Sequence, residues 1–136
     1  MKKSQNVRNT LTKNQMLVLG VLNNAEMPLS AYSILDALRD FGFKAPLQVY
    51  RALDTLIALG KVHRIESMNA FIACEHSLCE ANDMTAFTIC NKCEKVSEVE
   101  DKELSDYMQI RAEKFGLYAP KTKIEFHGLC PECCNN

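Results

Sequence analysis

The spacing of seven cysteines is the feature that most restricts what this 136-residue chain can fold into. All seven lie at or after Cys74, and four of them form two CxxC pairs, Cys90/Cys93 and Cys130/Cys133, with 36 residues between the pairs. A tetrahedral Zn²⁺ ion is commonly held by two such pairs, each of which supplies two thiolates from a tight turn. We therefore predict that Cys90, Cys93, Cys130 and Cys133 bind one structural zinc ion.

Other uses of clustered cysteines fit the chain less well. The N-terminus is polar and no run approaches the roughly 18 apolar residues of a membrane span, so we expect a cytoplasmic protein without a membrane segment. Disulfides are rare in that reducing compartment. A redox pair is normally a single CxxC that opens a helix, whereas here each pair follows an apolar, strand-like run. Cys134 is expected to be a spare thiol.

The charge is unevenly distributed along the chain. The net charge is −1, but residues 1–73 hold nine Lys and Arg against five Asp and Glu, while residues 74–136 hold seven against twelve. A composition of 47% hydrophobic and 24% charged residues is that of a folded globular protein and excludes collagen-like and disordered chains. The asymmetry indicates a lobe that faces nucleic acid, joined to a lobe with another task.

The first half of the chain has the signals of three helices and a hairpin. A capping box at Thr12 begins a helix that ends near residue 24, Ser30 begins a second that stops at Gly42, and Pro46 begins a third that Gly60 terminates. Two short strands follow, at 61–65 and 69–73. Three helices followed by a hairpin predict a winged helix.

The third helix separates into two faces at helical spacing. Its apolar stripe is expected to face the core and contains Val49, Leu53, Leu56 and Ile57. The opposite face is predicted to read DNA bases and contains Gln48, Arg51, Ala52 and Thr55.

Each residue of that second face has a possible role in base recognition. Arg51 can donate to guanine O6 and N7, Gln48 can pair with adenine, and the small Ala52 and Thr55 let the backbone approach the major groove. Tyr32 and Tyr50 are expected to reach phosphates from the flanks. The alternative is a solvated helix face with no ligand.

The second half is predicted to be a small α/β unit. Strands are expected at 85–90, 95–100 and 121–128, and a helix capped by Asp101 is expected to stop at Gly116. The fold class is therefore α+β. We expect a winged helix-turn-helix domain at 1–74, a hinge at 75–84, and a zinc-clamped α/β domain at 85–136.

These residues resemble the ferric uptake regulator (Fur) superfamily, most closely its zinc uptake regulator branch. The resemblance runs through 30–32, 49–54, 60–67, 89–93 with Glu98, and 127–133. It implies a homodimeric, metal-dependent repressor whose winged helix binds double-stranded operator DNA, whose second domain dimerises, and whose four CxxC cysteines hold a structural zinc ion.

The resemblance also implies a second, regulatory zinc site, and hence two zinc ions per chain. The matching residues are His63, Cys74 and Glu98, each of which has an ordinary structural alternative as a strand histidine, a small buried residue or a surface carboxylate. Zinc-sensing relatives commonly place a histidine seven residues before the first cysteine of the CxxC pair, where this chain has Asp83. Nearby His76 competes with Asp83 as the fourth ligand, and Cys79 is a further possibility. His127 is expected to be structural.

The predicted function is a zinc-responsive repressor of zinc-acquisition genes. The run of histidines that iron-sensing members carry is absent, and thiolate with imidazole suits zinc. The alternatives are an iron or peroxide sensor of the same superfamily, and a zinc-stapled adaptor that binds a protein through its helix face. We expect no enzymatic activity and no small-molecule substrate, since no nucleophile and base are recognisable as a set.

Overall fold

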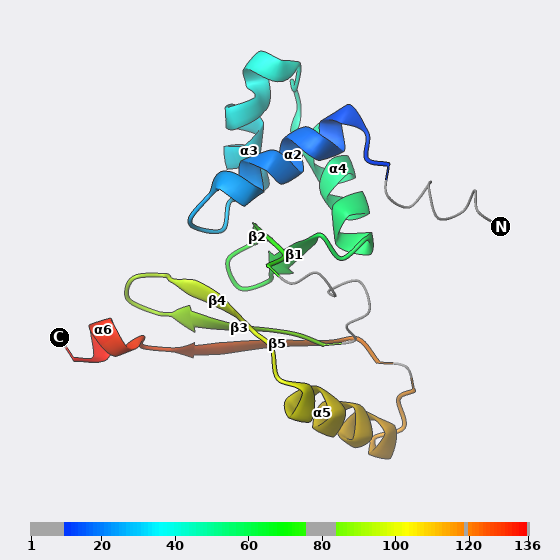
Figure 1. The fold of residues 1–136 in the computed structure, drawn as a ribbon, viewed down its shortest axis with the longest axis vertical. Helices are drawn as coiled ribbons and strands as arrows, with labels where there is room; N and C mark the ends of the chain where they lie inside the picture. The colour runs from blue at the N-terminus through cyan, green and yellow to red at the C-terminus, as the bar shows by residue number, and fades with distance from the viewer. Residues whose placement is uncertain (1–9, 76–83, 119, 136) are drawn as a thin grey trace. The chain divides into compact units, whose positions relative to one another are not determined.

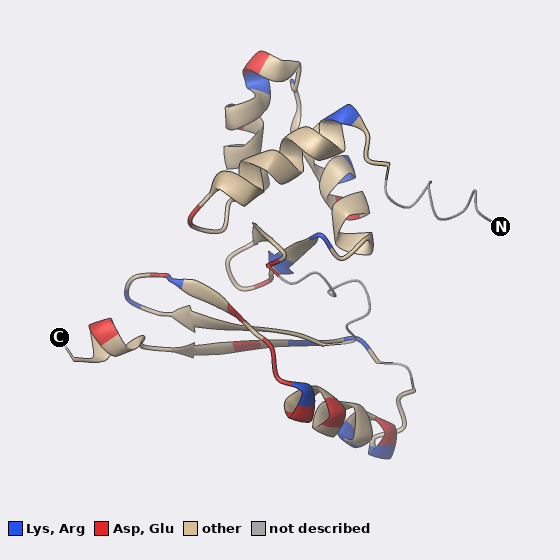
Figure 2. Ribbon diagram, viewed as in Figure 1, with Lys and Arg blue, Asp and Glu red and all other residues tan. Residues whose placement is uncertain are grey.

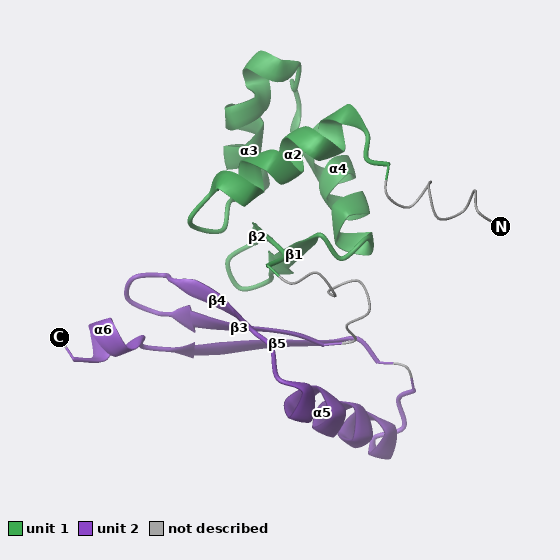
Figure 3. Cartoon of the chain, viewed as in Figure 1, with its two compact units in different colours: residues 1–80 green, residues 81–136 purple. Residues whose placement is uncertain are grey.

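The computed structural model describes residues 10–75, 84–118 and 120–135, and the chain divides into two compact units (Figure 3). Unit 1 is residues 1–80 and unit 2 is residues 81–136. Each unit contains both helices and strands, which confirms the predicted α+β class. Most of the predicted hinge at 75–84 lies outside the described residues, as do His76, Cys79 and Asp83.

Three helices and a short 3-10 turn make up most of unit 1 (Figure 1). They are α2 Lys13–Asn24, α3 Ala31–Leu38, η1 Arg39–Phe41 and α4 Pro46–Ala58. The predicted caps are present: the backbone N–H of Gln15 donates to Thr12 Oγ1 at 3.1 Å, and that of Ser33 donates to Ser30 Oγ at 3.1 Å. Local hydrogen bonds therefore set where the first two helices begin.

A two-stranded hairpin completes unit 1. Strands β1 Val62–Ile65 and β2 Ala70–Ala73 pair antiparallel, and Leu29 bridges to Phe71 through two backbone hydrogen bonds of 2.9 and 2.8 Å. This confirms the predicted winged helix. The helices and the hairpin enclose one apolar core, whose largest fully buried side chains include Ile34, Leu53 and Leu56.

Unit 2 is a three-stranded sheet with two helices. Its elements are β3 Met84–Cys90, β4 Val96–Val99, α5 Lys102–Lys114, β5 Thr122–Gly128 and α6 Pro131–Cys134. The strand order is β4-β3-β5; β4 is antiparallel to β3, and β5 is parallel to β3. Asp101 caps α5, as predicted, by accepting from the backbone N–H of Leu104 at 3.0 Å. The sequence did not predict the short helix α6.

Little apolar surface is buried within unit 2. Among the residues of unit 2 that the structure describes, the buried hydrophobic side chains all come from β3, and α5 has none. Large side chains on and after α5 stay exposed, including Tyr107, Ile110 and Phe115. Basic and acidic residues are mixed along α5 (Figure 2). Among the described residues no helix combines the length and the apolar character needed to cross a bilayer.

Candidate metal centre and nucleic-acid interface

The β3–β5 ladder brings the two CxxC pairs together. Cys90 is the last residue of β3 and pairs with Gly128 at the end of β5, so Cys130 follows the ladder by two residues. Cys93 lies in the turn after β3, and Cys133 lies on α6. The four sulfur atoms all lie within 4.8 Å of one another, and the Sγ atoms of Cys93 and Cys130 are 3.8 Å apart.

Backbone amides prepare one of these sulfurs for metal binding. Cys90 Sγ accepts hydrogen bonds from the backbone N–H groups of Cys93, at 3.5 Å, and Cys130, at 3.4 Å. These bonds favour the thiolate and lower the pKa of Cys90 to about 5. The pKa of Cys133 is raised to about 12, chiefly by its hydrogen bond with the Cys130 sulfur and also by burial.

This donor set fits Zn²⁺. Four convergent sulfurs, one of them already held as a thiolate by backbone donors, match the tetrahedral all-cysteine environment that zinc takes in structural sites. Cys134 is exposed and is not one of the four. His127, on β5, has its Nε2 atom 3.0 Å from Glu125 Oε1 and is not one of the four convergent cysteine-site residues.

Two of the predicted regulatory ligands lie together in unit 1. His63 is on β1 opposite Ile72 and is only 8% exposed, while Cys74 follows β2 and its backbone N–H donates to the carbonyl of Lys61 at 2.9 Å. The ligand atoms of His63 and Cys74 lie within 4.8 Å of one another. The Cys74 sulfur is in a disulfide in this structure, so metal binding there requires its reduction.

The third predicted regulatory ligand belongs to unit 2. Glu98 lies on β4 opposite Phe87, and its side chain is half-buried. The candidates for the fourth ligand lie outside the described residues: they are His76 and Asp83, which compete, and Cys79 as a further possibility.

The polar face of α4 is narrower than the sequence predicted. Arg51 is exposed and Thr55 is half-buried, with Thr55 Oγ1 donating to the Arg51 carbonyl at 3.4 Å. Ala52 is only 4% exposed and belongs to the core, so its predicted place on the outer face was wrong. The reason is that α4 packs against α2, α3 and β1, which widens its buried stripe beyond that of a helix packed from one side.

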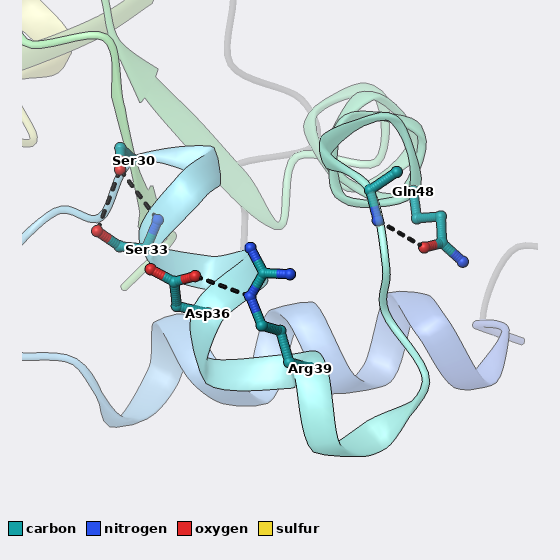
Figure 4. Close-up of polar contacts among 6 residues, drawn as sticks. Ser30, Ser33, Asp36, Arg39 and Gln48 are labelled. Atoms are coloured by element: carbon teal, nitrogen blue, oxygen red, sulfur yellow. Dashed lines mark hydrogen bonds and ion pairs between the residues drawn. The ribbon is translucent and has the colours of Figure 1, made fainter.

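Gln48 is turned toward the start of its own helix. Its Oε1 accepts from the backbone N–H groups of Lys44, at 2.6 Å, and Ala45, at 3.1 Å, and Figure 4 draws one of these two bonds. Two donors fix the carboxamide with its oxygen inward, because the amide nitrogen cannot accept them. The predicted pairing with adenine does not match this conformation, since it needs the same oxygen as an acceptor.

The two flanking tyrosines have different surroundings. Tyr32 is on the first turn of α3 and is 62% exposed. Tyr50 is half-buried, packs against the core and meets the ring of Phe71 edge-on at 6.5 Å. Leu47, which sequence reasoning did not single out, is 56% exposed on the same helix as Arg51.

Comparison with known proteins identifies the family. A family model described as the ferric uptake regulator family matches residues 5–127. The zinc uptake regulation protein of Escherichia coli (strain K12) is 38% identical over 130 residues, which are 95% of this chain and 74% of that protein.

Two solved structures are similar along nearly the whole chain. Holo XcZur has a TM-score of 0.82 at 39% identity and the match covers 93% of this chain and 87% of that one. A zinc uptake regulator complexed with zinc and DNA has a TM-score of 0.82 at 36% identity, covering 98% of this chain and 90% of that one. From its fold, its sequence and these matches, the chain belongs to the ferric uptake regulator family.

Proposed function

We propose that this protein is a zinc-responsive transcriptional repressor that binds operator DNA as a metal-loaded dimer and controls zinc-acquisition genes. The observation that carries the proposal is the match along 98% of the chain, at a TM-score of 0.82, to a zinc uptake regulator complexed with zinc and DNA. The predicted winged helix and the convergent cysteines supply the two chemistries, DNA binding and zinc binding, that such a regulator needs.

The proposed structural zinc ion is held by Cys90, Cys93, Cys130 and Cys133. When bound, the ion supplies a cross-link between the turn after β3 and the helix after β5. The chain's own contribution is to hold the four sulfurs in place, through the β3–β5 ladder and the amide donors to Cys90. Exposed apolar side chains on and after α5 support a second copy of the chain as the partner of unit 2.

The proposed regulatory zinc ion, the second per chain, is held by His63, Cys74 and Glu98, with His76 or Asp83 as the fourth ligand. The proximity of the His63 and Cys74 ligand atoms supports this assignment. The imidazole and the thiolate come from the hairpin of unit 1, and the carboxylate comes from β4. An ion that needs all of them favours only the arrangement of the chain that brings them together.

The proposed DNA-reading surface is centred on α4. Arg51 is exposed and can donate two hydrogen bonds to a guanine, while Thr55 and Gln48 flank it on the helix. Tyr32 and Tyr50 are proposed to contact phosphates. A dimer must hold its two recognition helices about 34 Å apart, or a multiple of that distance, to enter successive major grooves, so a fixed arrangement of the units increases operator affinity.

Two further parts of the proposal follow from this role. The protein acts in the cytoplasm, where operator DNA lies, and its metal sites serve structure and sensing rather than catalysis.

The adaptor alternative explains the zinc clamp but not the exposed Arg51 on a winged helix. An iron sensor is disfavoured by the thiolate of the Cys74 position, because sulfur with imidazole favours zinc.

The test is DNA binding at controlled free metal. Reduced protein is titrated onto a fluorescent promoter fragment of a zinc-acquisition gene in buffered Zn²⁺ and, separately, in buffered Fe²⁺, with a fragment of scrambled sequence as the control. We expect retention of the promoter fragment to increase with free Zn²⁺ and the scrambled fragment to stay weakly bound. A response to Fe²⁺ alone would identify an iron sensor, and binding with no metal response would contradict zinc sensing.

A further inference from the structure

Leu47 is an exposed apolar side chain at the start of α4. It is the second residue of the helix and is 56% exposed. Single exposed hydrophobic residues are common on protein surfaces, so exposure alone assigns no role. Its position is more informative, because Leu47 and Arg51 are four residues apart on one helix and both are exposed, which places them on the same face.

The first turn of α4 is held in place by its own side chains. Pro46 occupies the first helical position, where its fixed φ suits the helix, and Gln48 caps the backbone N–H groups of Lys44 and Ala45. Leu47 lies between Pro46 and Gln48, so these two neighbours fix the position of its backbone in the first turn of α4. In helix-turn-helix proteins the N-terminal residues of the recognition helix are the ones that contact base edges.

The chemistry of Leu47 restricts what it can recognise. A leucine side chain forms no hydrogen bond, and the C5-methyl of thymine is the apolar group that the major groove presents. Four residues of α-helix rise about 6 Å, which corresponds to one or two base-pair steps of about 3.4 Å each. An Arg51 placed against a guanine therefore leaves Leu47 near a base one or two steps away.

We propose that Leu47 is a specificity-determining residue that packs against the methyl group of a thymine close to the guanine read by Arg51. The inference rests on the proposed function, since it takes α4 to be the helix that enters the major groove. It adds a preference for thymine over cytosine at one position of each half-site. Gln48 cannot read the methyl group, because its outward amide group only donates hydrogen bonds, and uracil offers the same O4 acceptor as thymine.

The test removes the thymine methyl group without changing base pairing. A duplex is selected from a random pool by the zinc-loaded, reduced protein, and each thymine is then replaced in turn by deoxyuridine. At one thymine per half-site the replacement should weaken binding about fourfold, which is the ~0.8 kcal/mol of one buried methyl group. Leu47→Ala should remove that difference, so that thymine and uracil duplexes bind the variant within about 1.5-fold of each other.

Two variants serve as controls. Met16 on α2 has the same exposed fraction, 56%, so Met16→Ala removes a matched apolar surface away from α4 and should keep the fourfold uracil effect. Leu47→Met retains an apolar side chain of similar volume, so it should keep at least half of the uracil effect, counted as the logarithm of the ratio of the two affinities. Thermal unfolding of all three variants should match the wild type.

The outcomes separate this inference from the proposed function. If no thymine shows a uracil effect, or if Leu47→Ala leaves the effect unchanged, Leu47 does not read a thymine methyl group, while zinc-dependent DNA binding stands. An equal loss by Leu47→Ala on thymine and uracil duplexes would mean a contact with the sugar-phosphate backbone and would also overturn the inference. If the wild-type protein selects no duplex in zinc, both the inference and the proposed function fail.

Discussion

Replacing Cys93 with serine is expected to unfold unit 2 and to leave unit 1 folded. The change removes one of the four sulfurs at the proposed structural zinc site, and its Sγ lies 3.8 Å from that of Cys130. Without the ion, the end of β3 and the residues that follow β5 are joined by hydrogen bonds such as that from the Cys130 N–H to Cys90 Sγ, each of which contributes much less than a bound zinc ion. We therefore expect Cys93→Ser to lose this zinc ion and to be largely monomeric, because unit 2 is the proposed dimerisation domain.

The magnitude follows from how little unit 2 buries. Its large buried side chains are Met84, Phe87 and Ile89, each of which contributes roughly 1.5–3 kcal/mol by burial. A structural zinc ion contributes about 10–16 kcal/mol in small zinc-finger peptides at neutral pH. Loss of the ion thus removes more free energy than these three side chains supply together. Unit 1, whose core draws on all three helices and the hairpin, does not depend on the site.

The assay is hydrogen exchange measured peptide by peptide, together with metal analysis and size-exclusion chromatography. In Cys93→Ser, amides of 84–90 and 122–128 should exchange at the unprotected rate, while those of α2 and α4 keep their protection. Cys134→Ser is the matched control, since Cys134 is exposed, lies directly after Cys133 and is not one of the four convergent cysteines. A dimeric Cys93→Ser protein with wild-type zinc content and wild-type protection in β3 would refute the argument.

Three further predictions concern the regulatory site, the DNA interface and the thiols. Cys74→Ala, in reductant, should lower the retained zinc from two ions per chain to one and abolish zinc-dependent operator binding while the dimer persists; an unchanged zinc response would exclude Cys74 as a ligand. Arg51→Ala should cost about 1–3 kcal/mol on the operator and little on random DNA, measured by anisotropy, whereas equal losses would indicate a phosphate contact. Calorimetry in buffers of different ionisation enthalpy should show that zinc displaces the Cys133 proton at neutral pH, because the pKa of Cys133 is about 12. Zinc should displace one more proton, from Cys90, only below the Cys90 pKa of about 5, so zinc affinity should decrease more steeply as the pH is lowered through that value. A number of displaced protons that stays constant across that range would contradict this prediction.

Features fixed by local chemistry were predictable from the sequence. Thr12 and Ser30 cap their helices through hydrogen bonds to residues three positions away, so the signal and the structure lie within one turn. The convergence of the four CxxC cysteines was predictable for a different reason, namely that two CxxC pairs in one chain are typical of a single tetrahedral zinc site.

Features that depend on tertiary packing were not predictable in this way. Helical periodicity places Ala52 on the outer face of α4, but periodicity does not show how many neighbours a helix has, and α4 packs against α2, α3 and β1. Gln48 is a local exception: its oxygen accepts from backbone N–H groups three and four positions earlier, and the predicted pairing with adenine overlooked this cap. Leu47 was not singled out, because a leucine in a pattern is indistinguishable from a core residue until its exposure is known.

The parallel pairing of β3 with β5 has a consequence for the rate at which the protein folds. Every β5 residue lies 38 positions after its partner on β3, whereas the contacts that form the helices of unit 1 are local. Closing a loop of that length has an entropic cost before any ladder bond forms, so unit 2 should fold more slowly than unit 1. The ladder ends at the Cys90–Gly128 pair, beside the convergent cysteines, so a zinc ion held by these cysteines would close the loop, and the two strands could then pair from that end.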